Sequence, residues 1–179
     1  MNHYILQIQK ELIRYGYNPG VADGIAGPKT LEALKNALSH TGVTPKPTPA
    51  PKYKLSARSE SRMAGVHKDL VKVVRRAIEI TDVDFTVGEG LRTQARQRQL
   101  VAQGASKTMN SRHLTGHAVD LIALDDDGKV SWDWPLYHRI AAAMKQAAAE
   151  VGVPIEAGAD WKTFPDGPHF QLPWKNYPR

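Results

Sequence analysis

The chain has 179 residues and no Cys, a length that suits one ordinary domain or one domain with a very small companion. The missing Cys excludes disulfides, thiol nucleophiles and Cys-based metal sites, so a metal could be bound only by His, Asp or Glu. Of the net charge of +6, residues 43–62 carry +4 and the flanking segments +1 each. This uneven distribution argues against a nucleic-acid partner, which the basic composition alone would suggest.

The sequence also lacks the two features that would indicate membrane insertion or export. No run of about 18 apolar residues is present, so we expect no transmembrane segment. The N-terminus lacks the charged and apolar regions of a Sec signal peptide. We therefore expect a protein, most simply a monomer, that is made in the cytoplasm.

Residues 1–41 form the first module, and apolar residues there lie at helical spacing on both sides of a turn. Ile5, Ile8 and Leu12 predict one helix, which Gly16 and the Asn18-Pro19-Gly20 run end. Pro28 is suited to the first position of a second helix that carries Leu31, Leu34 and Leu38 on one face. Such a small all-α module must be very compact.

A Pro-rich linker, residues 42–54, follows. Prolines alternate with other residues at positions 45, 47, 49 and 51. They remove amide donors and favour an extended polyproline conformation, so the segment can continue neither a helix nor a sheet. We interpret it as a linker rather than as an SH3-type ligand.

Residues 55–179 form the second module and predict mixed helices and antiparallel strands, hence an α+β domain. Helical patterns lie at 66–78, 93–103 and 136–151, and strand patterns at 83–87, 118–124, 153–156 and 169–172. Asp127-Gly128 predicts a hairpin turn. The run Asp125–Asp127 could suggest calcium, but it lacks the alternating ligands of an EF-hand loop, which favours a solvated turn.

The segment Ser111–Asp120 is the densest polar constellation. On a helix His113, His117 and Asp120 would share a face, as in helical zinc sites. Gly116 and several β-branched residues favour a turn that enters a strand instead. A carboxylate among apolar strand neighbours is expensive unless it is paired or bound to a metal.

A second constellation, Asp166–His169, contains a carboxylate and an imidazole separated by Gly167-Pro168. Two His and one carboxylate from separate segments would leave an open position on zinc, which is the catalytic arrangement. The remaining carboxylate could then serve as general base.

Both motifs in this order resemble the zinc peptidases of the LAS type, which have a hedgehog/D-Ala-D-Ala peptidase-like fold. That group includes D-alanyl-D-alanine carboxypeptidases and phage L-alanyl-D-glutamate endolysins. The resemblance covers roughly residues 60–175. It implies zinc on His113, Asp120 and His169, and Asp166 as catalytic base. Arg92 stands where the family has a substrate-contacting Arg, which would hold a substrate carboxylate or the developing oxyanion. Ser111 and His117 are further candidates for substrate binding.

Residues 1–40 resemble the peptidoglycan-binding type 1 repeat, through Gln9, the Gly16-Tyr17 pair and the run Asp23–Thr30. A binding module, a linker and a LAS peptidase together resemble a modular phage endolysin, which lyses the host by cutting peptidoglycan. Endolysins usually reach the wall through a holin pore. The alternatives are a D-alanyl-D-alanine carboxypeptidase of the same fold and a non-catalytic wall-binding protein with a degenerate peptidase domain.

Overall fold

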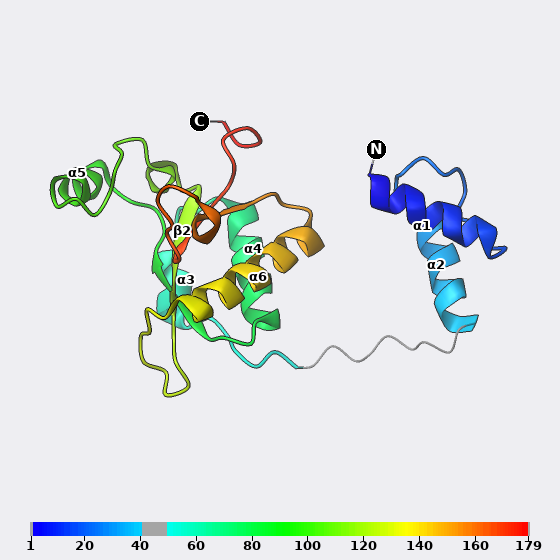
Figure 1. Ribbon diagram of the computed structural model, residues 1–179, viewed down its shortest axis with the longest axis horizontal. Coiled ribbons are helices and arrows are strands. Elements are labelled where there is room, and N and C mark those ends of the chain that lie inside the picture. The colour runs from blue at the N-terminus through cyan, green and yellow to red at the C-terminus, as the bar shows by residue number, and fades with distance from the viewer. Residues whose placement is uncertain (1, 41–49, 179) are drawn as a thin grey trace. The chain divides into compact units, whose positions relative to one another are not determined.

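The computed structural model of the chain describes residues 2–40 and 50–178 (Figure 1). The chain divides into two compact units, Met1–Thr48 and Pro49–Arg179. Most of the predicted linker, residues 42–49, lies outside the described residues. Within the described ranges, no helix combines the length and the apolar character that a membrane crossing requires.

The N-terminal unit contains two helices, α1 (His3–Arg14) and α2 (Pro28–His40). Its buried positions agree only in part with the predicted apolar faces, because Leu12 is buried but other predicted residues are not. Ile8 and Leu31 are 40% and 52% exposed, whereas Gln9 is 1% exposed. The Gln9 side chain accepts a hydrogen bond from the backbone of Gly24 and donates one to Thr30 Oγ1. A buried hydrogen-bond network thus supplements a small apolar core, because so short a unit cannot bury much apolar surface.

The C-terminal unit is an α+β domain, as the sequence predicts. Its four strands form one antiparallel sheet in the order β1-β2-β4-β3. The elements in chain order are α3 (Ala57–Arg62), α4 (Lys68–Ile80), β1 (Phe85–Glu89), α5 (Gln94–Ala102), the 3₁₀ turn η1 (Arg112–Thr115), β2 (Ala118–Ala123), α6 (Trp134–Val151), β3 (Glu156–Ala157), the 3₁₀ turn η2 (Gly158–Asp160) and β4 (His169–Gln171).

Two elements differ from the sequence-based expectation. The short helix α3 was not expected, because its sequence ARSESR carries no apolar period. The third strand begins at Glu156 rather than at Val153, so the pairing with β4 spans only two residues. The predicted hairpin turn is confirmed: Leu124 pairs with Val130 across the turn at Asp127-Gly128.

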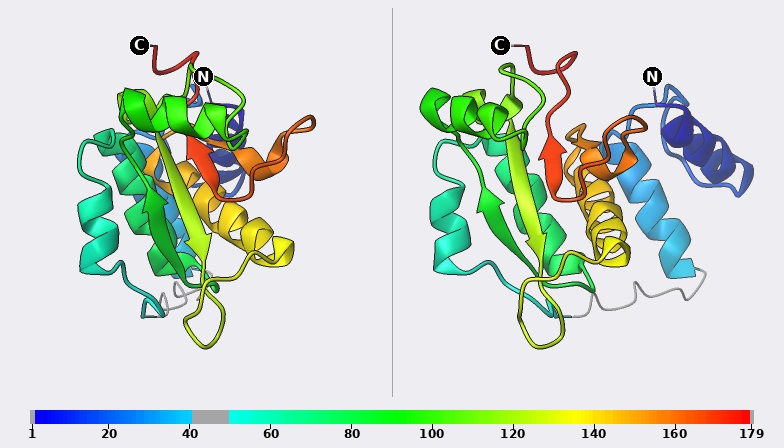
Figure 2. Two further views of the ribbon diagram at one scale, coloured as in Figure 1. Left: turned by 90° about the vertical axis from the view of Figure 1, so that its left-hand side faces the viewer. Right: turned by 60° about the vertical axis from the view of Figure 1, so that its left-hand side comes forward.

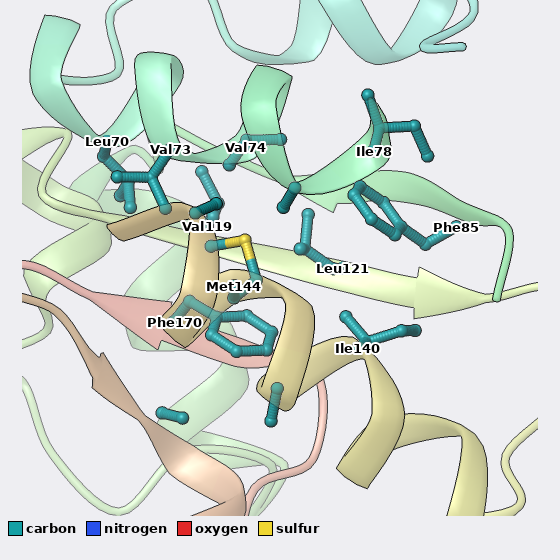
Figure 3. Close-up of a cluster of buried hydrophobic side chains, with 14 of the residues drawn as sticks. Leu70, Val73, Val74, Ile78, Phe85, Val119, Leu121, Ile140, Met144 and Phe170 are labelled. Carbon is teal, nitrogen blue, oxygen red and sulfur yellow. The ribbon is translucent and has the colours of Figure 1, made fainter. Parts of the chain in front are cut away.

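Helices α4 and α6 pack against each other and cover the same face of the sheet (Figure 2). Figure 3 shows Val74 of α4 above Val119 and Leu121 of β2, with Met144 of α6 and Phe170 of β4 on the other side of the core. Strand side chains alternate between the two faces. Asp120 and His169, the neighbours of these apolar residues, therefore lie on the opposite face, where the polar constellations meet.

A β-bulge in β1 brings one more carboxylate to that polar face. Val87 pairs with Leu121, but Glu89 pairs with Asp120, because Gly88 is an extra residue in the strand. Without the bulge Glu89 would share the core face of Val87, two residues away. The space at Gly88 is also restricted, since a Cβ there would lie 2.8 Å from the Ile122 side chain.

Candidate active site

The 3₁₀ turn η1 presents the first imidazole of the site. Ser111 caps it, with its hydroxyl accepting a hydrogen bond from the backbone N–H of His113. Gly116 ends the turn with a φ of +69°, a conformation that glycine adopts without strain. A Cβ at Gly116 would also collide with the carbonyl oxygen of Gly65. The turn leads directly into β2, which confirms the expectation of a turn and a strand rather than a helix.

Pairing of β2 with β4 brings the other two groups together, because Asp120 lies opposite His169 in the antiparallel register. The Oδ1 atom of Asp120 is 3.2 Å from His113 Nε2 and 3.2 Å from His169 Nδ1. The two nitrogens are 3.3 Å apart. Residues far apart in sequence thus converge on one point, and both imidazoles are buried there.

Hydrogen bonds on the outer side of each imidazole define which nitrogens face that point. His113 Nδ1 is 2.8 Å from the carbonyl oxygen of Gly90, which can only accept, so Nδ1 carries the proton. Gln171 donates to Glu156 through its Nε2, which turns its Oε1 toward His169 Nε2 at 3.0 Å. In the neutral imidazoles, His113 Nε2 and His169 Nδ1 are therefore bare acceptors that face each other.

Three acceptor atoms that converge without a donor suit a bound cation. Ligand atoms of a tetrahedral ion with bonds of about 2.0–2.1 Å lie about 3.3 Å apart, which agrees with the observed 3.2–3.3 Å. His113, Asp120 and His169 form the one His, Asp and Glu group in the described parts of the chain that has the spacing for a metal ion. The outer hydrogen bonds match those that orient metal-ligating His residues.

The electrostatics of the cluster favour positive charge at its centre. Burial alone would raise the pKa of Asp120, but hydrogen bonds and charge from His113 and then His169 hold that pKa well below its usual range. Burial alone would lower the pKa of His169, yet the hydrogen bond and charge of Asp120 raise it. The surroundings that stabilise a proton here stabilise a metal ion for the same reason.

Arg92 is buried beside the cluster rather than exposed on the surface, with 8% of its side chain accessible. Its guanidinium donates to Glu89 Oε2, to Gln97 Oε1 at 2.8 Å and to Asp120 Oδ2 at 3.4 Å. Asp120 therefore presents Oδ1 to the imidazoles and Oδ2 to Arg92. These contacts fix the orientation of the carboxylate.

Asp166 lies in the loop before β4, and its backbone hydrogen bonds stabilise the conformation of that loop. Its backbone N–H donates to Gly158 and its carbonyl accepts from His169 N–H. A Cβ at Gly158 would collide with the Asp166 carbonyl, so this close approach requires glycine. Burial, and then the charge of Asp120, raise the pKa of Asp166. A carboxyl with a raised pKa beside a metal-type cluster is suited to proton transfer.

A cavity of about 510 Å³ opens onto this cluster. Its lining contains six of the seven predicted site residues, namely Arg92, Ser111, His113, Asp120, Asp166 and His169. Three tryptophans, Trp132, Trp161 and Trp174, also line it. Trp132 is 64% exposed, so it belongs to the wall of the cavity rather than to the core. Isolated Trp residues carry no spacing signal, so the sequence alone does not place them at the site.

His117 lies away from this cavity. Its ring stacks on His67 at 5.2 Å and its Nδ1 is 2.8 Å from Thr115 Oγ1. Burial, then the charges of Arg112 and His67, lower the pKa of His117. The structure thus brings together every predicted site residue except His117, whose role in substrate binding remains a prediction.

A buried His–Asp–His cluster with a neighbouring carboxylate, in an α+β domain, has the composition of a metallopeptidase site. Residues 52–171 match the family described as phage L-alanyl-D-glutamate peptidase, and residues 4–43 match the putative peptidoglycan binding domain. The chain therefore belongs to the phage L-alanyl-D-glutamate peptidase family.

Individual relatives agree with this membership. The L-alanyl-D-glutamate peptidase of Escherichia phage T5 is 37% identical over 118 residues, which span 64% of this chain and 85% of that protein. The L-alanyl-D-glutamate peptidase of Listeria phage A118 is 32% identical over 125 residues, 70% of this chain and 43% of the relative. The crystal structure of Serratia marcescens L-Ala D-Glu endopeptidase ChiX is similar with a TM-score of 0.67 and 51% identity, covering 72% of this chain and 96% of that one.

Proposed function

We propose that the protein is a phage endolysin, a zinc-dependent endopeptidase that hydrolyses the L-alanyl-D-glutamate bond of peptidoglycan stem peptides. The observation that carries this proposal is the convergence of three acceptor atoms next to a separate carboxylate, in a chain of this family. The basic linker and the binding module would hold the enzyme at the wall, and a holin pore would give it access.

The donor set favours zinc among the common metal ions. Two imidazole nitrogens and one carboxylate are suited to zinc, whereas magnesium and calcium prefer oxygen ligands. In this proposal His113 Nε2, Asp120 Oδ1 and His169 Nδ1 hold the ion. When bound, zinc would act as a Lewis acid and lower the pKa of a coordinated water to about 7.

The chain's own residues would perform the proton transfers. Asp166 lines the same cavity as the metal-type cluster, and its carboxylate would accept a proton from the attacking water and pass it to the leaving amine. Arg92 would keep Asp120 oriented through its hydrogen bond to Oδ2. Contact of Arg92 or Ser111 with the substrate is part of the proposal, since both side chains line the cavity.

Product analysis tests the cleaved bond. Purified peptidoglycan digested by the zinc-loaded protein should yield fragments with new N-terminal D-Glu, detected by mass spectrometry. Free D-Ala would indicate the carboxypeptidase alternative. No soluble product, with zinc supplied, would contradict both activities and support a non-catalytic wall-binding protein.

We propose separately that residues 1–41 bind the cell wall and that residues 55–179 cleave it. The match of residues 4–43 to the binding-domain family supports this proposal. Deleting residues 1–41 should weaken co-sedimentation with insoluble peptidoglycan by about tenfold or more, as expected when one of two linked binding modules is lost. Cleavage of a small soluble stem peptide should be unchanged, because the site belongs to the other unit. Equal loss of both properties would contradict the proposal.

A further inference from the structure

Charged side chains other than the proposed metal ligands and the proposed base also line the cavity. Its acidic lining residues are Glu89, Asp120 and Asp166, and its basic ones, apart from imidazoles, are Arg92, Lys107 and Arg112. Arg92 is paired with Glu89 and Asp120. The partners of the other two cations determine whether either can receive an anionic group from a substrate.

The guanidinium of Arg112 is occupied by contacts with the C-terminal segment. It donates to the carbonyl oxygens of Leu172 and Tyr177, each 2.8 Å from Nη2. The same group lies 4.2 Å from the centroid of the Trp174 ring, and the residue is only 2% exposed. Such a buried and engaged guanidinium is a structural element of the wall rather than a site for an incoming carboxylate.

Lys107 differs from both arginines. It is exposed, lines the cavity, and forms no ion pair with any carboxylate in the described parts of the chain. Its ammonium group lies 5.7 Å from the centroid of the Phe164 ring, which also lines the cavity. Phe164 precedes Asp166 by two residues in the loop before β4. The Lys107 charge therefore lies next to the loop that also carries the proposed base.

Both sequence neighbours of Lys107 are anchored by hydrogen bonds to one buried side chain. Gln97 of α5 is fully buried, and its Nε2 donates to Ser106 Oγ at 2.8 Å and to the Thr108 carbonyl at 2.6 Å. Its Oε1 accepts from Arg92 at 2.8 Å. One buried amide therefore connects the segment that carries Lys107 to the arginine beside the metal-type cluster. This connection distinguishes Lys107 from a lysine on an unsupported surface loop.

The proposed substrate offers a matching group. A glutamate residue has two carboxyl groups, and only one of them continues the peptide chain, so the other stays free next to the bond that is cut. At neutral pH this group is a carboxylate. We propose that Lys107 is a specificity-determining residue that binds this free carboxylate. This inference rests on the proposed function and adds the residue that distinguishes a glutamate from an uncharged analogue.

Two synthetic stem peptides test the inference, one with the free glutamate carboxylate and one with that group converted to a carboxamide. The wild-type protein should cleave the carboxylate peptide with a kcat/KM about tenfold or more above that for the amide, as expected for loss of one charge-assisted contact. Lys107→Met should remove this preference by lowering kcat/KM for the carboxylate peptide alone, mainly through KM. Lys107→Arg should restore most of it.

Lys162→Met is the matched control, because Lys162 is exposed in the neighbouring loop but does not line the cavity. It should leave both substrates unaffected. Equal losses on the two peptides in Lys107→Met, or an unchanged preference, would overturn the role of Lys107 while leaving the peptidase activity established. If the wild-type protein cleaves neither peptide, the proposed function is wrong and the inference falls with it.

Discussion

Replacing His169 with alanine should release the metal and abolish turnover. The change removes one of the three converging acceptor atoms, His169 Nδ1, and leaves the half-buried Asp120 carboxylate with a single imidazole partner. Metal affinity should fall by more than the ten- to hundredfold that is typical of changes to residues around a ligand. The zinc content per chain after dialysis, measured by mass spectrometry of the metal, should drop from one to near zero, and His113→Ala should behave alike.

His117→Ala is the matched control for metal content. It also removes an imidazole from the same segment, but this ring stacks on His67 outside the cavity. The variant should therefore retain one zinc per chain. Gln171→Leu should give an intermediate result, since it keeps all three ligand atoms but removes the hydrogen bond to His169 Nε2 and the one to Glu156. Full zinc occupancy in His169→Ala would contradict the assignment of this ligand.

The meeting of Asp120 and His169 could be predicted from the sequence, because the alternation of side chains along a strand places both residues on the polar face of the sheet. Asp120 and His169 each alternate with core residues, Val119 and Phe170, which are fully buried. Once the two strands pair, both polar side chains must lie on the opposite face. The turn at Gly116 likewise follows from local chemistry, since a glycine can adopt its positive φ without strain.

The outer parts of the site could not be predicted in the same way. Glu89 reaches the polar face only through the bulge at Gly88, and a bulge changes the periodicity on which strand prediction depends. Gln171 and Glu156 meet through a pairing of two residues between β3 and β4. Such short, long-range pairings leave almost no local pattern, although they orient His169.

In the N-terminal unit the helices were predicted, but of the residues on their predicted apolar faces only Leu12 is buried. Helical spacing correctly located α1 and α2, yet the side chains that lie inside include Gln9 and Thr30. In a unit of about 40 residues, few apolar side chains can be covered, so a satisfied hydrogen-bond network contributes to the interior. Hydrophobic periodicity indicates where the helices lie, but in so small a unit it identifies the buried residues only in part.

Asp166→Asn should separate catalysis from metal binding. Asparagine has a similar shape but cannot accept the proton of an attacking water as a carboxylate does, so kcat should fall by about 10²–10⁴-fold, the usual contribution of a general base. The metal should remain at one zinc per chain, because Asp166 is not part of the converging His113, Asp120 and His169 group. Turnover of a soluble stem peptide and zinc content would be measured on the same preparation.

Asp160→Asn provides the matched control for this change. Asp160 lies six residues earlier, is exposed, pairs with Lys145 and does not line the cavity. The same substitution there should leave kcat and zinc content unchanged. If Asp166→Asn also lost its zinc, Asp166 would be a metal ligand rather than the base. If it retained both zinc and wild-type turnover, another group would have to accept the proton. With Asp120 assigned to the metal, the one further carboxylate among the described residues that line the cavity is Glu89, which already forms an ion pair with Arg92.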